Sequence, residues 1–378
     1  MRLALCGNVF PADGPEDVLA ALRGPVAQWG AGLQAAGQAA PYGFGLHVSA
    51  RAAEHYTASP EARLALQEAM AASKLSCWTA NAFPFGDFHA AKVKEGAFLP
   101  DWTSPERVRF TLQVAELLAQ LAPQDGSPLS ISTCPLGYGR SAREDARSVA
   151  HLQQVAEALQ QLSQLHQRAF LLSIEPEPDG GFERGVALAQ WIAVTFPKSQ
   201  HACLGICFDL CHAAVVGESV GEILSAVQAT GIPIGKVQIS SALAIPEPPS
   251  DVTLAFLKRL TDDPYLHQVR GLDGQGQAFA AADVPIFLDR PDAFQCSNLR
   301  IHCHVPVSLS DFPEGLHGTP WREAVQACSD AGIADFELET YTLPVLPPEL
   351  LEAQGTVGTM VAESLACFSS LRLDTPPG

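Results

Sequence analysis

The sequence has little positive charge and no long uninterrupted apolar run. Of its 378 residues, 23 are Lys or Arg and 41 are Asp or Glu, so the formal net charge is −18. A field of that sign repels phosphate backbones, and we therefore expect no nucleic-acid partner. No stretch reaches the ~18 consecutive apolar residues of a membrane span, and the N-terminal apolar run is too short for a secretory signal. We expect a cytoplasmic protein without membrane insertion.

The ten cysteines lack the spacing of a disulfide framework. The run Cys203, Cys207 and Cys211 has neither zinc-finger nor iron–sulfur spacing. Other cysteines lie in apolar segments, where a reduced cysteine behaves as a small hydrophobic side chain. We therefore expect the cysteines to pack in the core rather than to bind metal.

Short apolar segments alternate with longer amphipathic ones along most of the chain. The expected strands are residues 2–6, 43–49, 75–81, 129–134, 170–176, 204–210, 235–241 and 336–340, and helical periodicity covers 104–122, 142–167, 184–196, 218–229 and 319–331. This alternation predicts right-handed βαβ units and a parallel sheet. Eight units favour a closed (β/α)8 TIM barrel over an open sheet, because the segment after the first strand lacks a Gly-rich nucleotide loop.

One segment interrupts the alternation between the seventh and eighth strands. Residues 243–300 are rich in Pro, Asp and Gly, and a ninth strand-like piece follows at 299–307. We expect an insertion, residues 243–307, that lies over the barrel mouth and forms a β-hairpin with part of 270–288. The prediction is thus a single TIM-barrel domain over 1–372, with a frayed tail at 373–378.

Acidic residues follow three of the expected strands. The βα loops at the carboxyl ends of TIM-barrel strands surround one mouth, and Glu175, Asp209 and Glu339 occupy such positions. Glu177 has the same strand phase as Glu175 and lies one step further out. Burial of an unpaired carboxylate is costly, and a metal ion or another cation offsets that cost. For Glu175, a structural salt bridge is the alternative.

Histidines accompany these carboxylates. His212 follows Asp209 by three residues, and a hard oxygen ligand beside an imidazole suits Mn, Mg, Zn, Co or Fe. In the insertion, His302 and His304 alternate with apolar residues and therefore share one strand face. Gln238 on the seventh strand is an uncommon ligand, so a hydrogen bond to substrate or a core network is the alternative.

Two carboxylates on opposite barrel walls predict a catalytic pair. A metal ion between Glu175 and Glu339 would polarise a hydroxy-carbonyl group while a carboxylate moves a proton from the adjacent carbon. We therefore expect an isomerase or epimerase, with a lyase as a variant, acting on a small polyhydroxylated metabolite. Asn81 and His89 belong to an aromatic-rich segment after the third strand, which would cover the substrate or else plug the barrel end.

The order IEP, FDLCH, a polar residue on strand seven and a Glu on strand eight resembles the xylose-isomerase-like TIM-barrel superfamily of sugar phosphate isomerases and epimerases. More narrowly, the chain resembles the metabolite traffic protein EboE family. The segments that carry this resemblance are YGFGLHVSARAA, NAFPFGDFHAAKVK, FLPDW, SISTCPLGYG, IEPEPDG, FDLCHAAV, YLHQV, HCHVPV and ELETYT. The resemblance implies that the protein is encoded in an operon tied to moving secondary-metabolite precursors. It also implies a small-molecule ligand. A homo-oligomer and operon-encoded protein partners are both compatible with it.

The superfamily resemblance also implies roles for individual residues. Glu175, Asp209 and Glu339 would bind the metal, and His212 would bind the substrate. From their positions in the sequence, we expect Asn81, His89, Gln238 and His302 to bind the substrate as well. The superfamily's strand-seven histidine ligand is replaced by Gln238. The fourth ligand is then Gln238, His302 or His304, or the site is metal-free, and we expect His304 because it lies closer to the end of its strand.

The same replacement leaves a second interpretation open. A metabolite-binding or handover protein would keep the barrel without catalysing a reaction. A DNA-repair role by analogy with endonuclease IV, which shares the superfamily, is disfavoured by the net charge of −18.

Overall fold

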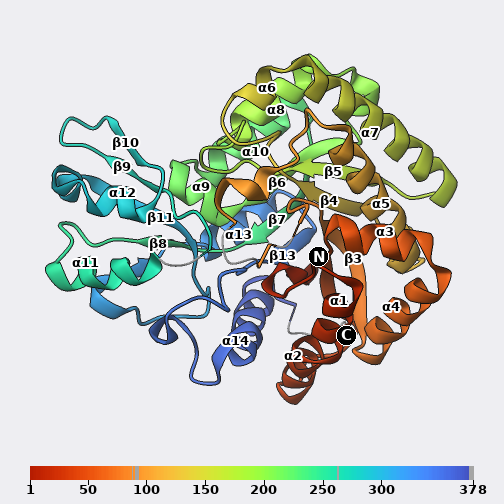
Figure 1. Cartoon of the computed structure of the whole chain (residues 1–378), viewed down its shortest axis with the longest axis horizontal. Helices are drawn as coiled ribbons and strands as arrows, with labels where there is room; N and C mark the ends of the chain where they lie inside the picture. Colours follow the sequence, from red (N-terminus) through yellow and green to blue (C-terminus); the bar gives the residue numbers. More distant parts are fainter. Residues whose placement is uncertain (87, 90–92, 262–263, 374–378) are drawn as a thin grey trace.

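The computed structural model describes residues 1–86, 88–89, 93–261 and 264–373, and its centre is a closed barrel of eight parallel strands (Figure 1). The strands are β1 (Arg2–Cys6), β2 (Tyr42–His47), β3 (Leu75–Asn81), β4 (Leu129–Thr133), β5 (Phe170–Ile174), β6 (Leu204–Asp209), β7 (Ile234–Ile239) and β13 (Asp335–Leu338). Their order around the barrel is β1, β13, β7, β6, β5, β4, β3, β2. The predicted (β/α)8 barrel is therefore confirmed.

Helices surround the barrel on its outer side (Figure 1). They are α1 (Pro15–Arg23), α2 (Pro25–Ala35), α3 (Ala50–Ala58), α4 (Pro60–Ala72), α5 (Pro105–Leu121), α6 (Ser141–Glu144), α7 (Ala146–His166), α8 (Gly185–Thr195), α9 (Leu210–Val216), α10 (Val220–Thr230), α13 (Arg322–Asp330) and α14 (Gly355–Ser370). Several begin at a capping side chain, as where Ser59 Oγ accepts from the Ala62 amide ahead of Pro60.

Among the described residues, no single helix is long and apolar enough to cross a membrane. The helices α9 and α10 meet that criterion only when taken together, as a pair bent by 106°.

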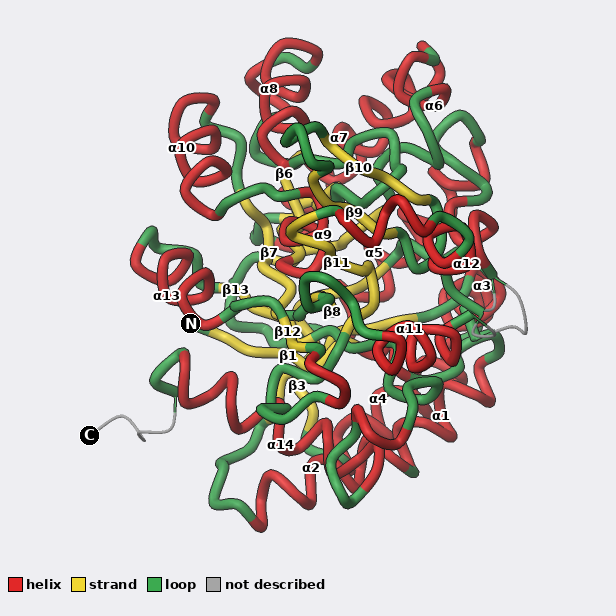
Figure 2. The backbone as a smooth tube through the Cα atoms, turned by 90° about the vertical axis from the view of Figure 1, so that its left-hand side faces the viewer, coloured by secondary structure: helices red, strands yellow, loops and turns green. Residues whose placement is uncertain are grey.

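The chain between β7 and α13 forms a second sheet beside the barrel (Figures 1 and 2). Its elements are β8 (Ala242–Ala244), α11 (Asp251–Leu257), β9 (Val269–Leu272), β10 (Ala278–Ala281), α12 (Val284–Leu288), β11 (Ser297–His304) and β12 (His317–Gly318). The strand order is β10, β9, β11, β8, β12, and every pairing is antiparallel. The hairpin expected within 270–288 is the β9–β10 pair, and the sheet continues past residue 307 because β12 pairs with β8.

Within this sheet, β11 reaches the barrel. It packs against α9, the short helix that follows β6. The register of β11 against β8 shifts between Ile301 and His304, and such a bulge changes the direction of the side chains around it. The carboxyl end of β11 is thereby aimed at the carboxyl ends of the barrel strands.

The expected tail beyond Leu373 lies outside the described residues.

The barrel interior contains a buried ion pair. Lys236 Nζ of β7 donates to Glu337 Oε2 of β13 at 2.5 Å, and both side chains are fully buried. Burial opposes the charge of Lys236, but the charge of Glu337 and its hydrogen bond, together with the other groups around the ammonium, raise the pKa of Lys236. Gly45 of β2 leaves the space that Glu337 occupies, since a Cβ there would lie 1.8 Å from Glu337 Oε1.

All ten cysteines lie among the described residues, where they are buried and form no disulfide. The Cys207 thiol of β6 donates to Gln238 Oε1 at 2.9 Å. Burial raises the pKa of Cys207 well above its usual value, with a further contribution from the nearby Glu175 charge, so the side chain stays a thiol. These cysteines therefore pack in the core, as their setting in the sequence predicts.

Glu363 of α14 is buried where the last helix meets the barrel top. Its Oε1 accepts from Thr340 Oγ1 at 2.8 Å and from the Val307 amide at 3.0 Å. Its Oε2 has no hydrogen-bond partner among the described residues. Burial raises the pKa of Glu363 to about 7.

Replacement of Gly45 by Ala tests the packing against the ion pair. Because the new methyl group would overlap Glu337 Oε1, we expect Gly45→Ala to lower the free energy of unfolding by about 1–3 kcal/mol or more. Chemical denaturation measures this loss. Gly221→Ala is the control, since a Cβ at that exposed helix position meets nothing within 4 Å. Equal stability of Gly45→Ala and wild type would contradict the packing.

Glu363 predicts a defined pH dependence of stability. The folded protein keeps the Glu363 proton up to about pH 7, whereas the unfolded chain releases it near pH 4.3. Stability therefore falls as pH rises through this window and levels off above it. Glu363→Gln should reduce this pH-dependent loss of the free energy of unfolding by up to about 3 kcal/mol. Denaturation at pH 5 to 8 measures this loss, and Glu68→Gln at an exposed position is the control. Curves of stability against pH that run parallel for wild type and Glu363→Gln would refute the prediction.

Candidate metal centre

Three carboxylates from the ends of β5, β6 and β13 lie together at the top of the barrel. Glu175, Asp209 and Glu339 each place a carboxylate oxygen within 4.8 Å of the other two, and all three side chains are buried. The parallel ladder positions them, as where the Glu175 amide donates to Thr133 O at 2.9 Å. The structure thus brings together the three carboxylates expected as metal ligands.

Neighbouring polar groups orient these carboxylates but leave two of their oxygens without a hydrogen-bond partner among the described residues. Asp209 accepts from the His212 amide at 2.8 Å, and Ser240 Oγ lies 2.9 Å from both Asp209 oxygens. Glu339 Oε1 accepts from Asn8 Nδ2 at 2.5 Å. Among the described residues, Glu175 Oε2 and Glu339 Oε2 have no hydrogen-bond partner. Each of these two side chains therefore has a free, buried oxygen.

The electrostatics of the cluster are unfavourable without a cation. Burial raises the pKa of Glu175 well above its usual value, and the Glu339 and Asp209 charges raise it further. Burial likewise raises the pKa of Glu339, followed by the charge of Asp209. Lys236 acts in the opposite direction on both pKa values, but its ammonium group is paired with Glu337. Such a site favours a bound cation.

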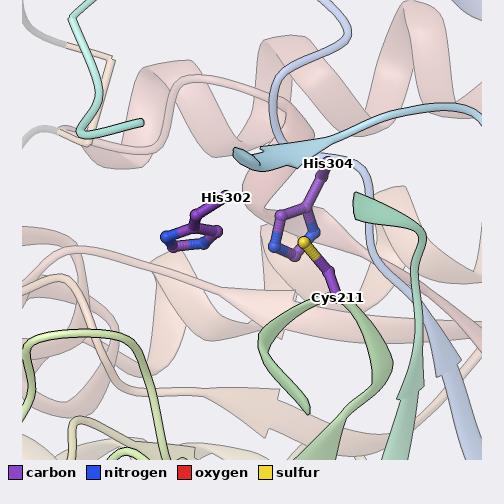
Figure 3. Close-up of side chains that lie close together, drawn as sticks. All are labelled: Cys211, His302 and His304. Carbon is purple, nitrogen blue, oxygen red and sulfur yellow. The ribbon is translucent and has the colours of Figure 1, made fainter. Parts of the chain in front are cut away.

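Three imidazoles adjoin the carboxylates. His212 belongs to α9, and His302 and His304 lie on the same side of β11, with Cys211 next to the His304 ring (Figure 3). His212 Nε2 is 2.9 Å from His302 Nε2 and 3.4 Å from His304 Nε2. Burial lowers the pKa of His212 to about 4 and also lowers those of His302 and His304, so the rings are neutral.

Several groups of these side chains have the spacing of metal ligands besides the three carboxylates. They are Asp209 with His212 and His304, Glu177 with His212 and His302, and Cys211 with His302 and His304. In each group the ligand atoms lie within 4.8 Å of one another. His304 is therefore placed next to Asp209, and its Nδ1 lies 3.0 Å from the Glu339 carbonyl oxygen.

A pocket of about 540 Å³, counting the space open to solvent, gives access to these groups. Glu175, Glu339, His212 and His302 line its floor.

Aromatic side chains surround the mouth of the pocket. Phe88, Tyr265 and Tyr341 all line it, and their ring centroids lie 4.9–5.2 Å apart. Tyr265 comes from the insertion and Tyr341 from the loop after β13. The pocket therefore combines an acidic and imidazole floor with an apolar rim.

The remaining predicted substrate-binding residues occupy different positions. Asn81 lines the pocket, and its Oδ1 accepts from the Phe83 amide at 2.9 Å. His89 lies near the rim, where its Nε2 is 2.8 Å from Asn8 O and its Nδ1 is 3.1 Å from the Tyr265 hydroxyl. Gln238 is fully buried and is not among the side chains that line the pocket.

Several pocket residues were not assigned a role from the sequence. Asn8 follows β1, and the strand-end rule that identified Asn81 applies to it equally. Glu177, one strand step beyond Glu175, reaches the pocket as its phase indicates. Tyr265 of the insertion lines the pocket, and Gln268 lies behind His302; neither had such a signal, because their position depends on how the second sheet packs on the barrel.

No protein-family model and no curated protein matches the chain. Solved structures do resemble it over its whole length. A xylose isomerase-like TIM barrel protein from Mycobacterium smegmatis, solved in complex with magnesium, has 10% identity and a TM-score of 0.52 over 99% of this chain and 97% of its own. The IolI protein, solved with a bound zinc atom, has 11% identity and a TM-score of 0.49 over all of both chains. At 10% identity, the likeness to the Mycobacterium protein shows the fold alone, a TIM barrel.

Proposed function

We propose that this chain binds a divalent metal ion at Glu175, Asp209 and Glu339 and acts as an isomerase or epimerase on a small polyhydroxylated metabolite. The observation that carries the proposal is the cluster of three buried carboxylates, two of which have an oxygen without a partner among the described residues. Donor atoms within 4.8 Å of one another fit a single ion, because metal–oxygen bonds of ~2.0–2.6 Å span that separation.

His304 of the insertion has ligand spacing to one member of this cluster, Asp209. The Glu339 carbonyl holds its Nδ1 at 3.0 Å, which leaves Nε2 to coordinate. We therefore propose His304, in place of a strand-seven histidine, as the fourth ligand. The oxygen-rich donor set suits Mg or Mn, and the Mycobacterium protein with this fold was solved with magnesium.

The residues of the pocket fit a proton transfer at carbon. A bound divalent ion supplies Lewis-acid polarisation of a carbonyl and its neighbouring hydroxyl. Glu175 and Glu339 face the pocket with free Oε2 atoms, so one carboxylate can take a proton from the carbon beside the carbonyl and return it. His212 and Asn81 line the same pocket and would orient the hydroxyl groups.

Metal binding provides the first test. Wild-type protein loaded with Mn²⁺ or Zn²⁺ and then desalted should retain metal by elemental analysis. Asp209→Asn and Glu175→Gln should each lower the affinity of the carboxylate site at least ~10-fold, and Ser240→Ala, which removes a hydrogen bond to a ligand, by ~10–100-fold. Exposed Glu68→Gln is the control. Wild-type protein that retains no metal would overturn the proposal.

Exchange with solvent provides the second test. Metal-loaded protein incubated in D2O with a panel of neutral sugars and cyclitols should incorporate deuterium at the carbon beside the carbonyl of its substrate. Glu175→Gln and Glu339→Gln should reduce that exchange by ~100-fold or more, the usual contribution of a general base. NMR measures the exchange.

The alternative is the handover role implied by the resemblance to the EboE family. In that case the metal-loaded protein binds a compound of this class tightly, and the bound compound exchanges no carbon-bound proton. This result would exclude the catalytic part of the proposal while leaving the metal site intact.

A further inference from the structure

A second group of ligands lies in the same pocket and shares no residue with the carboxylate cluster. Glu177, His212 and His302 place one ligand atom each within 4.8 Å of one another. All three side chains are buried, and all three line the pocket. They come from three separate elements, namely the loop after β5, the helix α9 and the insertion strand β11.

The hydrogen bonds of His302 determine which ring nitrogen carries the proton. His302 Nδ1 is 2.7 Å from Gln268 Oε1. The orientation of this amide is set at its other end, because Gln268 Nε2 donates to Pro178 O at 3.1 Å and a carbonyl can only accept. His302 Nδ1 therefore donates, and in the neutral ring Nε2 has a lone pair.

The same argument applies to His212. Its Nδ1 faces the Pro176 carbonyl oxygen at 3.1 Å, so Nδ1 donates and Nε2 has a lone pair. The two Nε2 atoms of His212 and His302 then lie 2.9 Å apart with a lone pair on each. In neutral rings no hydrogen lies between them, and two facing lone pairs repel each other unless a cation binds to both.

The spacing is that of two ligands on one ion. Two nitrogens ~2.0–2.1 Å from an ion, at the 90–109° angles of octahedral or tetrahedral coordination, lie ~2.8–3.4 Å apart. The observed 2.9 Å falls in this range. Glu177 supplies the third donor, because its Oε2 is buried without a hydrogen-bond partner among the described residues. The amide and carbonyl groups behind the two rings are the orienting partners typical of histidine ligands.

We propose that Glu177, His212 and His302 form a second divalent-metal site beside the carboxylate site, so that the pocket holds two ions. Two imidazoles and one carboxylate are a donor set for Zn, Fe, Co or Mn that leaves positions open toward the pocket. His212 adjoins both sites, since its Nδ1 lies 3.5 Å from Glu175 Oε1. A substrate with two adjacent oxygen atoms can then contact both ions, which suits a vicinal diol or a hydroxy-carbonyl compound.

The group of Cys211, His302 and His304 competes for the same imidazole. Its Cys211 and His304 are fully buried and do not line the pocket (Figure 3). Burial also raises the pKa of the Cys211 thiol, followed by the charge of Asp209, whereas a metal ligand must be a thiolate. Burial raises the pKa of the Glu177 carboxyl as well, but Glu177 lines the pocket, so an ion can enter there directly.

Metal stoichiometry tests the proposal with Co²⁺ as the probe. Wild-type protein titrated with Co²⁺ and desalted should retain two ions per chain by elemental analysis. His302→Ala and Glu177→Gln should each retain one, and so should Asp209→Asn, which removes a ligand of the carboxylate site only. Exposed His317→Ala of the same insertion sheet is the matched control and should retain two. Circular dichroism establishes that each variant is folded.

Three results would overturn this inference. The first is wild-type protein that saturates at one ion, with the same number of ions retained by His302→Ala and Glu177→Gln. The carboxylate site would then be the only metal site of the pocket, and the two imidazoles would share a proton instead of an ion. The second is a thiolate-to-cobalt absorption band that disappears in Cys211→Ser, which would place the ion at the thiol. The third is loss of both ions in every variant. A single ion that survives Asp209→Asn and is lost in His302→Ala would support the second site and contradict the first.

Discussion

Mutual repulsion among three buried carboxylates is the constraint on which the rest of the site depends. Glu175, Asp209 and Glu339 lie within 4.8 Å of one another at strand ends that the closed barrel holds in place. The nearby buried cation, Lys236, is paired with Glu337 in the barrel interior. The barrel therefore gathers carboxyl groups at its mouth whose ionisation is unfavourable, and a divalent ion would stabilise their charged forms without a change of the fold.

The insertion completes what the barrel strands lack. On β7, Gln238 bonds to the Cys207 thiol and takes no place on the pocket wall. Two imidazoles come instead from β11, where His302 and His304 contact the His212 ring. The second sheet thus brings nitrogen donors to a group of side chains that would otherwise offer mainly oxygen. Its packing on α9 couples the folding of the insertion to the assembly of the site.

The aromatic rim gives the pocket a second chemical character. Phe88, Tyr265 and Tyr341 pack edge to face or tilted around the entrance, and His89 connects this rim to Asn8 at the end of β1. Apolar rings limit the access of water, and a drier site strengthens the interaction between carboxylates and a cation. The same rings offer flat surfaces to the carbon–hydrogen faces of a cyclic polyol, in agreement with a small polyhydroxylated ligand.

The carboxylates were predictable from the sequence alone. Alternation of strand and helix requires a parallel barrel, a parallel barrel gathers its carboxyl strand ends at one mouth, and the position of Glu175, Asp209 and Glu339 therefore follows from local pattern. The contacts that these residues make with other side chains could not be predicted from the sequence, because tautomers, bulges and contacts between distant segments have no local sequence signal. Three facts are visible only in the tertiary structure. Gln268 lies behind His302, and His212 Nε2 lies 2.9 Å from His302 Nε2. Gln238 is not among the side chains that line the pocket. These contacts join segments 30 to 90 positions apart, and the packing of the insertion on the barrel decides them.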